Sequence, residues 1–142
     1  MFKNFKLIGI VCLIMAAMVA FSSCSKEQQI VGKWKITKAK INGENRENDE
    51  GETWIFKEGG KCILHFYSDD YEGTYSVKKN TLSVDVEVSR SSWKDRYYGD
   101  LDLDEFNKNE MAVSGTLKNT FYEEGYGSES NTEKFNFEFK KM

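Results

Sequence analysis

A strict alternation of apolar and polar side chains over residues 81–89 limits the possible folds of this chain more than any other feature. Leu82, Val84, Val86 and Val88 share one parity, and polar residues fill the positions between them. Successive side chains of a β-strand point to opposite faces of the sheet. The segment therefore predicts a strand with one buried face and one face in water.

Similar alternation recurs through most of the chain after residue 30, and no segment shows convincing helical spacing. We expect eight strands, over residues 30–41, 52–56, 61–67, 71–77, 81–89, 96–106, 110–121 and 134–140. In the first of these, Trp34 and Ile36 share one parity while Ala39 and Ile41 have the other. This change of parity predicts a bend within the first strand.

The connections between these segments determine how the strands pair. Gly59-Gly60 predicts a tight turn, whereas residues 42–51, 89–95 and 122–133 are polar and read as long loops. Strands in simple succession, without a long crossover, pair antiparallel. Eight of them can close into an up-and-down barrel, which removes exposed sheet edges. The sequence thus predicts an all-β, eight-stranded antiparallel barrel. A two-sheet sandwich is the alternative, although sandwiches usually need Greek-key connections.

The N-terminal region follows a different pattern. Lys3 and Lys6 precede fourteen apolar residues, 7–20, and the composition becomes polar after Cys24. This apolar run is short for a membrane span and ends in small residues, which is typical of a cleaved export signal. The ending Phe21-Ser22-Ser23-Cys24 resembles the lipobox of bacterial lipoproteins, which implies cleavage before Cys24 and acylation of its thiol. Ordinary secretion, with cleavage after Ser22, is the alternative.

These patterns predict a signal peptide at 1–23, a lipidated Cys24 with a short tether to residue 29, and one domain at 30–142. A domain of that length is large enough for one core and too small for two. Acyl chains on Cys24 would hold the protein at a membrane. We therefore expect an outer-membrane lipid-anchored protein of the cell envelope, on the periplasmic face or at the cell surface.

Charge and cysteine content narrow the possible partners. The chain has a formal net charge of −3 and no basic patch, so nucleic acid is not expected as a partner. Only Cys62 would remain as a free thiol in the mature domain, which excludes a disulfide framework. Because Cys62 shares strand parity with Leu64 and Phe66, we expect it to be a buried, inert thiol.

Gly32-Lys33-Trp34, on the first strand of an eight-stranded meander, resembles the lipocalins. The closer similarity is to the lipocalin-like domain family of bacterial lipoproteins, and it is carried by residues 32–34, 54–60, 73–77 and 80–82. The resemblance implies that Trp34 packs across the closed end of the barrel against a basic residue near the last strand. Lys134, Lys140 or Lys141 would supply that residue here.

No motif in the sequence indicates catalysis, a metal or a cofactor. His65 lies an odd number of positions after Cys62, so the two side chains face opposite sides of a strand. Asp100, Asp102 and Asp104 resemble the start of a calcium loop, but the glycine and glutamate that complete this motif are missing. Their alternation with leucines predicts the wet face of a strand instead. We expect no enzyme.

Aromatic side chains remain as candidates for a binding site. The candidates are Trp34, Trp54, Phe56, Phe66 and Tyr75 in the predicted strands, and Trp93, Tyr122 and Tyr126 at the rim of the end with the long loops. The strand aromatics can either line a cavity or fill an eight-stranded barrel completely. The first case predicts a barrel that binds a small hydrophobic or amphipathic molecule. The second predicts a non-catalytic interaction or accessory module of an envelope complex, with Trp93 at the contact with a partner protein.

Overall fold

The structure is a computed structural model that describes residues 26–142, so the predicted signal peptide and Cys24 lie outside the described residues. The chain divides into two compact units at Ile30. In the first unit, Lys26–Gln29 forms the short helix α3, so this part of the predicted tether is helical rather than extended. Within residues 26–142, no helix has the length and apolar character needed to cross a membrane.

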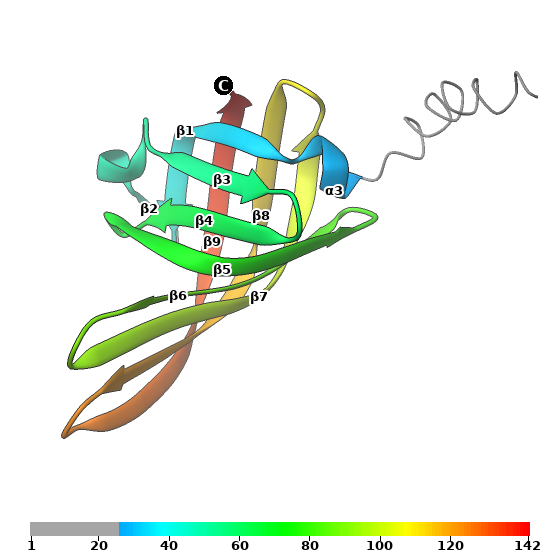
Figure 1. Cartoon of the computed structure of the whole chain (residues 1–142). Coiled ribbons are helices and arrows are strands. Elements are labelled where there is room, and N and C mark those ends of the chain that lie inside the picture. The colour runs from blue at the N-terminus through cyan, green and yellow to red at the C-terminus, as the bar shows by residue number, and fades with distance from the viewer. Residues whose placement is uncertain (1–25) are drawn as a thin grey trace, which may run out of the picture. The chain divides into compact units, whose positions relative to one another are not determined.

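The second unit, residues 31–142, is one antiparallel sheet that closes on itself (Figure 1). Strand order follows chain order, and β1 also pairs with β9. The strands are β1 (Gly32–Ile41), β2 (Glu44–Asn45), β3 (Thr53–Lys57), β4 (Lys61–Phe66), β5 (Asp69–Lys78), β6 (Thr81–Ser89), β7 (Trp93–Phe106), β8 (Glu110–Glu123) and β9 (Gly127–Lys141). The short β2 only flanks the end of β1, and the other strands form a closed eight-stranded barrel, as predicted.

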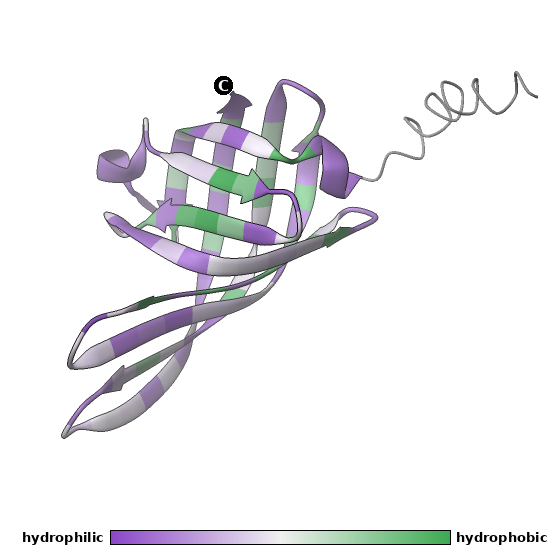
Figure 2. Cartoon of the chain, in the orientation of Figure 1, coloured by the Kyte–Doolittle hydropathy of each residue, from purple (hydrophilic) through white to green (hydrophobic). Residues whose placement is uncertain are grey.

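The apolar positions of the alternating segments are the positions that are buried inside the barrel. On β6, Leu82, Val84, Val86 and Val88 are all buried, while Asp85 and Glu87 between them are exposed. Figure 2 shows hydrophobic segments concentrated on the barrel strands. The bend predicted in the first strand is a register shift between β1 and β9 at residues 36–38. Because of this irregularity, residues of the other parity face the interior in the second half of β1, while the strand remains paired with β9.

Two hairpins, β6–β7 and β8–β9, extend beyond the barrel (Figure 1, lower left). β8 pairs with β9 as far as Glu123 and Gly127, whereas β1 accompanies β9 only to Phe135. The long loop predicted at 122–133 is therefore wrong, because only residues 124–126 connect the two strands. The loop predicted at 89–95 likewise shrinks to residues 90–92. Strands that are solvated on both faces lack the alternation that reveals a strand in the sequence.

The two ends of the barrel differ. The β3–β4, β5–β6 and β7–β8 turns lie at one end, the short-turn end, where β1 begins. The opposite end, the hairpin end, carries the β1–β3 connection, the β4–β5 turn and the tips of the projecting hairpins. The predicted loop at 42–51 contains β2 and a 3-10 helix at Glu47–Asp49. The additional structure at the hairpin end thus consists mainly of strands that project beyond the barrel, rather than of long loops.

Candidate ligand site at the hairpin end

Trp34 and Lys141 close the short-turn end of the barrel. The Lys141 ammonium nitrogen lies 4.6 Å from the centroid of the Trp34 ring. Phe106 approaches the same ring at 5.8 Å between centroids. Gly32, with φ at +134°, leaves the space that Lys141 uses, since a Cβ there would lie 2.7 Å from the lysine Cε. Of the three lysines expected as the partner of Trp34, Lys141 fills that role.

The middle of the barrel is packed with aromatic side chains. Trp54 lies 4.7 Å from Phe139, and Phe56 lies 4.9 Å from Tyr75, measured between ring centroids. The polar atoms of these rings are satisfied, because the Trp54 indole donates to the His65 carbonyl at 2.9 Å. The Tyr75 hydroxyl donates to a backbone carbonyl at 2.9 Å. The predicted pocket residues Trp34, Trp54, Phe56 and Tyr75 are therefore brought together as packed interior.

Phe66 belongs to a separate aromatic layer nearer the hairpin end. Its ring stacks on Tyr71, with centroids 4.2 Å apart and planes inclined by 5°. Tyr97 and Phe135 meet the Phe66 ring edge-on, at 5.0 and 5.1 Å. Offset-stacked and edge-to-face pairs are the arrangements that aromatic quadrupoles favour. All four rings are buried, so this layer too is packed interior, and it lies beneath a group of polar side chains.

These polar side chains form what we call the tyrosine–carboxylate cluster, which consists of Tyr67, Tyr71, Tyr97, Asp95, Asn119 and Glu133. The Tyr71 hydroxyl donates to Asp95 Oδ2 at 2.7 Å, and the Asn119 amide donates to Asp95 Oδ1 at 2.6 Å. Tyr97 donates to Glu133 Oε2 at 3.1 Å, and Tyr67 donates to Glu133 Oε1. The cluster joins β5, β7, β8 and β9 across the hairpin end.

The two carboxylates of the cluster are held by neutral donors. Within residues 26–142, the ion pairs involve other acidic groups, and neither Asp95 nor Glu133 has a cationic partner. Burial and the neighbouring carboxylates raise the pKa of Tyr71 and of Tyr97 far above the usual value. Both hydroxyls therefore stay protonated and donate. The cluster thus combines two acidic side chains with neutral donors, above a layer of buried aromatic rings.

Asp49 fixes one rim of this site. Its carboxylate is fully buried and accepts the backbone N–H groups of Tyr67 and Ser68 at 3.0 and 2.9 Å. Those two residues form the β4–β5 turn with φ of 55° and 60°, a conformation that side chains other than glycine adopt at some cost. Arg46 pairs with Asp49 at 3.3 Å and lies over the Tyr67 ring. The aspartate thus stabilises the turn that carries Tyr67.

His65 lies between two aspartates at the same rim. Its Nδ1 is 2.8 Å from Asp70 Oδ1, and its Nε2 is 3.5 Å from Asp49 Oδ1. Cys62 is buried on the opposite face of β4, as its parity predicted. Over the described residues, 26–142, no group of three or more His, Cys, Asp or Glu side chains is arranged to hold a metal ion. The aspartates at 100, 102 and 104 lie exposed on β7, as predicted.

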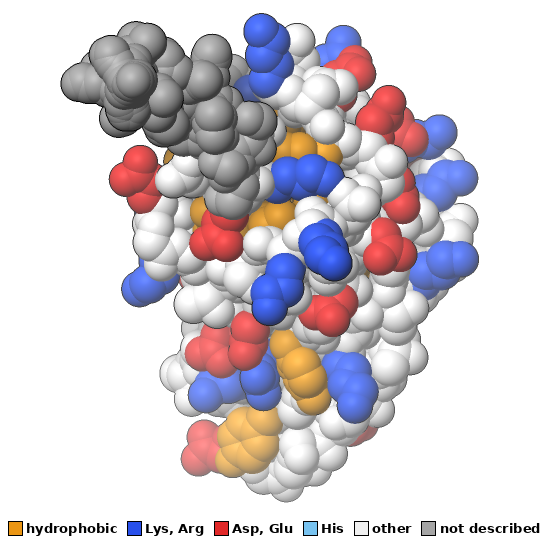
Figure 3. Space-filling view, turned by 90° about the vertical axis from the view of Figure 1, so that its right-hand side faces the viewer, with side chains coloured by type: hydrophobic (Ala, Val, Ile, Leu, Met, Phe, Trp, Pro, Cys, Tyr) orange, Lys and Arg blue, Asp and Glu red, His pale blue; other side chains and the backbone are white. Residues whose placement is uncertain are grey.

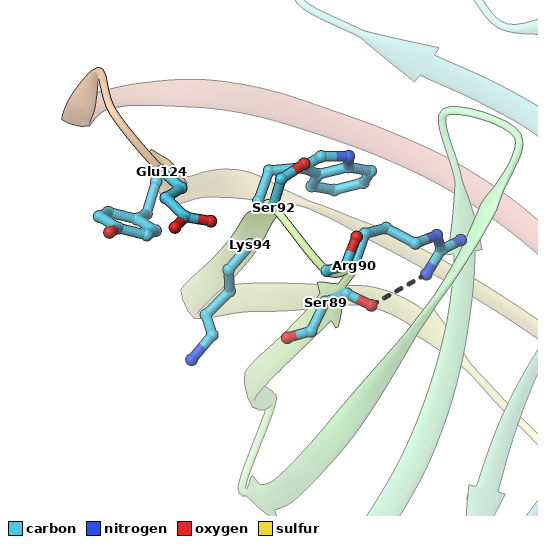
Figure 4. Close-up of a pocket in the computed structure, with 8 residues that line it drawn as sticks. Ser89, Arg90, Ser92, Lys94 and Glu124 are labelled. Atoms are coloured by element: carbon cyan, nitrogen blue, oxygen red, sulfur yellow. Dashed lines mark hydrogen bonds between the residues drawn. The ribbon is translucent and has the colours of Figure 1, made fainter.

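The remaining candidates lie on the projecting hairpins. Trp93 begins β7, packs 5.9 Å from Phe121 and lies under the Arg90 guanidinium. Trp93 and Tyr122 help to line a hollow of about 190 Å³ at the tips, where Arg90 donates to the Ser89 carbonyl (Figure 4). Tyr122 is 47% exposed and Tyr126 is 84% exposed. Figure 3 shows isolated hydrophobic side chains among charged ones toward the lower end of one face.

Sequence reasoning missed most of the tyrosine–carboxylate cluster. Tyr97 shares inward parity with Leu101 and Leu103, and this signal was available in the sequence. Asp95 and Glu133 stand in polar segments that predict loops, and a predicted loop gives no strand parity from which to place their side chains. Asp49 stood in a charged segment that gave no sign of burial.

The fold defines a lipocalin-like barrel, a closed eight-stranded sheet of the kind that can hold one small ligand. The family description "Lipocalin-like domain" matches residues 30–113, more than half of the chain. The protein therefore belongs to the lipocalin-like domain family. Comparison with curated proteins gave no significant match, and comparison with solved structures gave none either.

Proposed function

We propose that this protein is a lipid-anchored lipoprotein of the cell envelope whose barrel binds a small hydrophobic or amphipathic molecule at the hairpin end. The lipobox-like ending at Cys24 supports the anchor, and membership of the lipocalin-like family supports a binding barrel. The proposal assigns the protein no catalytic step, cofactor or metal. It places the protein at the outer membrane, on the periplasmic face or at the cell surface.

The tyrosine–carboxylate cluster is the observation that carries the binding proposal. The short-turn end and the middle of the barrel are packed by aromatic side chains, so a ligand would lie against the hairpin end. There, Asp95 and Glu133 are only partly buried above the Phe66 layer, and they offer acceptors that have no cationic partner within residues 26–142. This combination favours an amphipathic molecule with a donor or cationic head group.

The topology also suggests how the protein is oriented. β1 begins at the short-turn end, and only a few residues separate it from Cys24. Even a fully extended tether would reach no more than roughly 18 Å from the lipid. The short-turn end would therefore face the membrane and the hairpin end would face away from it. A site oriented in this way collects its ligand from solution.

Mass spectrometry of the natively expressed protein, under conditions that preserve complexes, tests the binding proposal. We expect a small amphiphile to co-purify, and we expect Tyr97→Phe to reduce its occupancy because Glu133 then loses a donor. Tyr98→Phe is the matched control, since Tyr98 lies on the opposite face of β7 under Arg96. Absence of any bound molecule, or equal occupancy in all three proteins, contradicts the proposal.

Cys24→Ala tests the anchor. The variant should stop maturing, because the signal is expected to be cut only after the cysteine is acylated, and it should no longer be retained by the membrane. Cell fractionation and the mass of the N-terminal peptide would detect both effects. Processed protein that still fractionates with membranes would show that Cys24 is not the anchor. The Cys62→Ala variant keeps the lipobox, so its distribution between membrane and soluble fractions should match that of the wild type.

A non-catalytic interaction module is the second candidate function. The packed middle of the barrel and the exposed Tyr122 and Tyr126 on the hairpin tips favour it. In that case no small molecule would co-purify, and a partner protein would be lost when the tip tyrosines are changed to serine. The same purification therefore separates the two functions.

A further inference from the structure

The projecting part of β9 is an open sheet edge. Between Gly127 and Glu133, β9 pairs with β8 on one side, whereas its pairing with β1 ends near Phe135. Residues 127–132 are all exposed. A closed barrel removes edges, but the part of a hairpin that projects beyond the barrel restores one.

The register identifies which backbone groups face the open side. The N–H and C=O of Lys134 both point away from β8, since they bond to the side chain and the backbone N–H of Asn42. No register shift interrupts the pairing of β8 with β9. Residues of the same parity, Ser128, Ser130 and Thr132, therefore direct their N–H and C=O groups to the open edge. Among residues 26–142 no partner occupies these groups.

Two glutamates determine the charge along this edge. Glu129 and Glu133 lie on β9 with the same parity, so they share the inner face of the hairpin sheet. Glu123 and Glu124 add negative charge at the neighbouring tip, and no lysine or proline protects residues 127–133. A second copy docked antiparallel would bring its own glutamates close to these. A strand with basic side chains on the inner face is complementary instead.

The outer face beside the edge contains a hollow. It has a volume of about 240 Å³ and is lined by Tyr98, Lys118, Asn119, Thr120, Ser130, Asn131 and Thr132. A strand added next to β9 would direct every second side chain toward this face. Apolar side chains at those positions would contact the side of the hollow that Ser130 and Thr132 line, because these residues lie on β9 itself.

We propose that the edge of β9 at residues 127–133 accepts an extended segment of a partner protein as an added strand. The segment carries lysine or arginine toward Glu129 and Glu133, and apolar residues toward the side of the hollow that Ser130 and Thr132 line. Backbone hydrogen bonds to Ser128, Ser130 and Thr132 supply the affinity, as in other cases of β-strand addition. Glu133 is common to this interaction and to the ligand site proposed for the barrel, whereas Glu129 and the backbone edge at residues 127–132 lie outside the ligand site.

Ser130→Pro tests the proposal with little risk to the fold. The Ser130 N–H faces the open edge, so proline removes an edge donor without removing a bond to β8, and proline is tolerated on edge strands. The probe is a short capped peptide of alternating lysine and valine, titrated into the full-length protein and followed by fluorescence anisotropy. We expect Ser130→Pro to weaken peptide binding about tenfold or more. Ser130→Ala, which keeps the N–H, should bind like the wild type.

Two further arms separate backbone pairing from charge attraction. A peptide methylated on alternate backbone nitrogens should lose binding, because it cannot donate to β9. Glu129→Lys should reverse the preference from the lysine peptide to one of alternating glutamate and valine. Thr132→Pro repeats the edge test if circular dichroism shows that Ser130→Pro is unfolded. The proposal is overturned if the wild type does not bind the lysine peptide, or if both proline variants bind it unchanged. It is also overturned if the protein self-associates and Ser130→Pro abolishes that self-association, because a second copy would then occupy the edge.

Discussion

Lys141, on the last strand, places its ammonium nitrogen 4.6 Å from the ring centroid of Trp34 on the first strand. Burial lowers the pKa of Lys141, so the charge is held against the ring with less water than a surface lysine has. Cation–π contacts of partly desolvated lysines contribute about 1 kcal/mol. We therefore expect Lys141→Ala to lower the free energy of unfolding by roughly 1 kcal/mol, measured by urea denaturation.

The neighbouring Lys140 supplies the control for that measurement. It is exposed on β9 and pairs in register with Lys35 and Glu110. Lys140→Ala should change stability by no more than about 0.5 kcal/mol. Equal losses in the two variants would mean that the Trp34 contact has no special role.

Asp49 stabilises the β4–β5 turn. Asp49→Ala should lower the free energy of unfolding by about 2 to 4 kcal/mol, because the turn N–H groups at 67 and 68 lose a charged acceptor. Asp70→Ala is the matched control, since Asp70 is an exposed acceptor of His65, and its loss should cost less than about 1 kcal/mol. Adding Ser68→Gly to Asp49→Ala should restore part of the stability, because glycine accepts a positive φ readily.

The tyrosines of the hairpin end predict a loss of stability in alkaline solution. The pKa of Tyr71 and of Tyr97 is raised in the folded protein, mainly by burial, whereas an unfolded tyrosine ionises near pH 10, about its ordinary value. The unfolded state then releases protons that the folded state keeps, so the stability present below that pH decreases above it. The urea midpoint should fall between about pH 9 and about pH 11. Tyr97→Phe should show a smaller fall, and an equal one would contradict the assignment.

Cys62 should be inert in the folded protein. Burial raises the pKa of its thiol to about 12, so almost no thiolate is present at neutral pH. A thiol reagent should label it slowly in the native state and rapidly in denaturant. Fast labelling of native protein would show that Cys62 is accessible. Lipidation of Cys24 would leave Cys62 as the thiol that this experiment reports.

The sequence predicted the barrel because its strands are wet on one face. Leu82, Val84, Val86 and Val88 could only alternate in this way on a half-buried strand, and the order of such segments gave the meander. The strands at the hairpin tips could not be predicted because both of their faces are solvated. Polar side chains occupy both faces, so the sequence shows no apolar–polar alternation there. Residues 122–133 therefore resemble a loop although they form two paired strands joined by a turn.

The candidate site was harder to predict than the fold. Phe66 could be identified by parity, but its partners Tyr71 and Tyr97 come together only through barrel closure and strand register. Asp49 depends even more on tertiary structure, since it bonds to a turn from another part of the chain. Local patterns carry information about burial, whereas a cluster assembled from several strands depends on long-range geometry.

The pairing of β1 with β9 has a consequence for the folding pathway. Strands from the two ends of the domain must meet before the barrel can close, and contacts so distant in sequence form slowly. Until β9 arrives, β1 and β8 each leave an unpaired edge, which favours aggregation. A chain that is synthesised from its N-terminus would therefore keep an open barrel until β9 has been released. During that interval it depends on chaperones or on a low protein concentration to avoid aggregation.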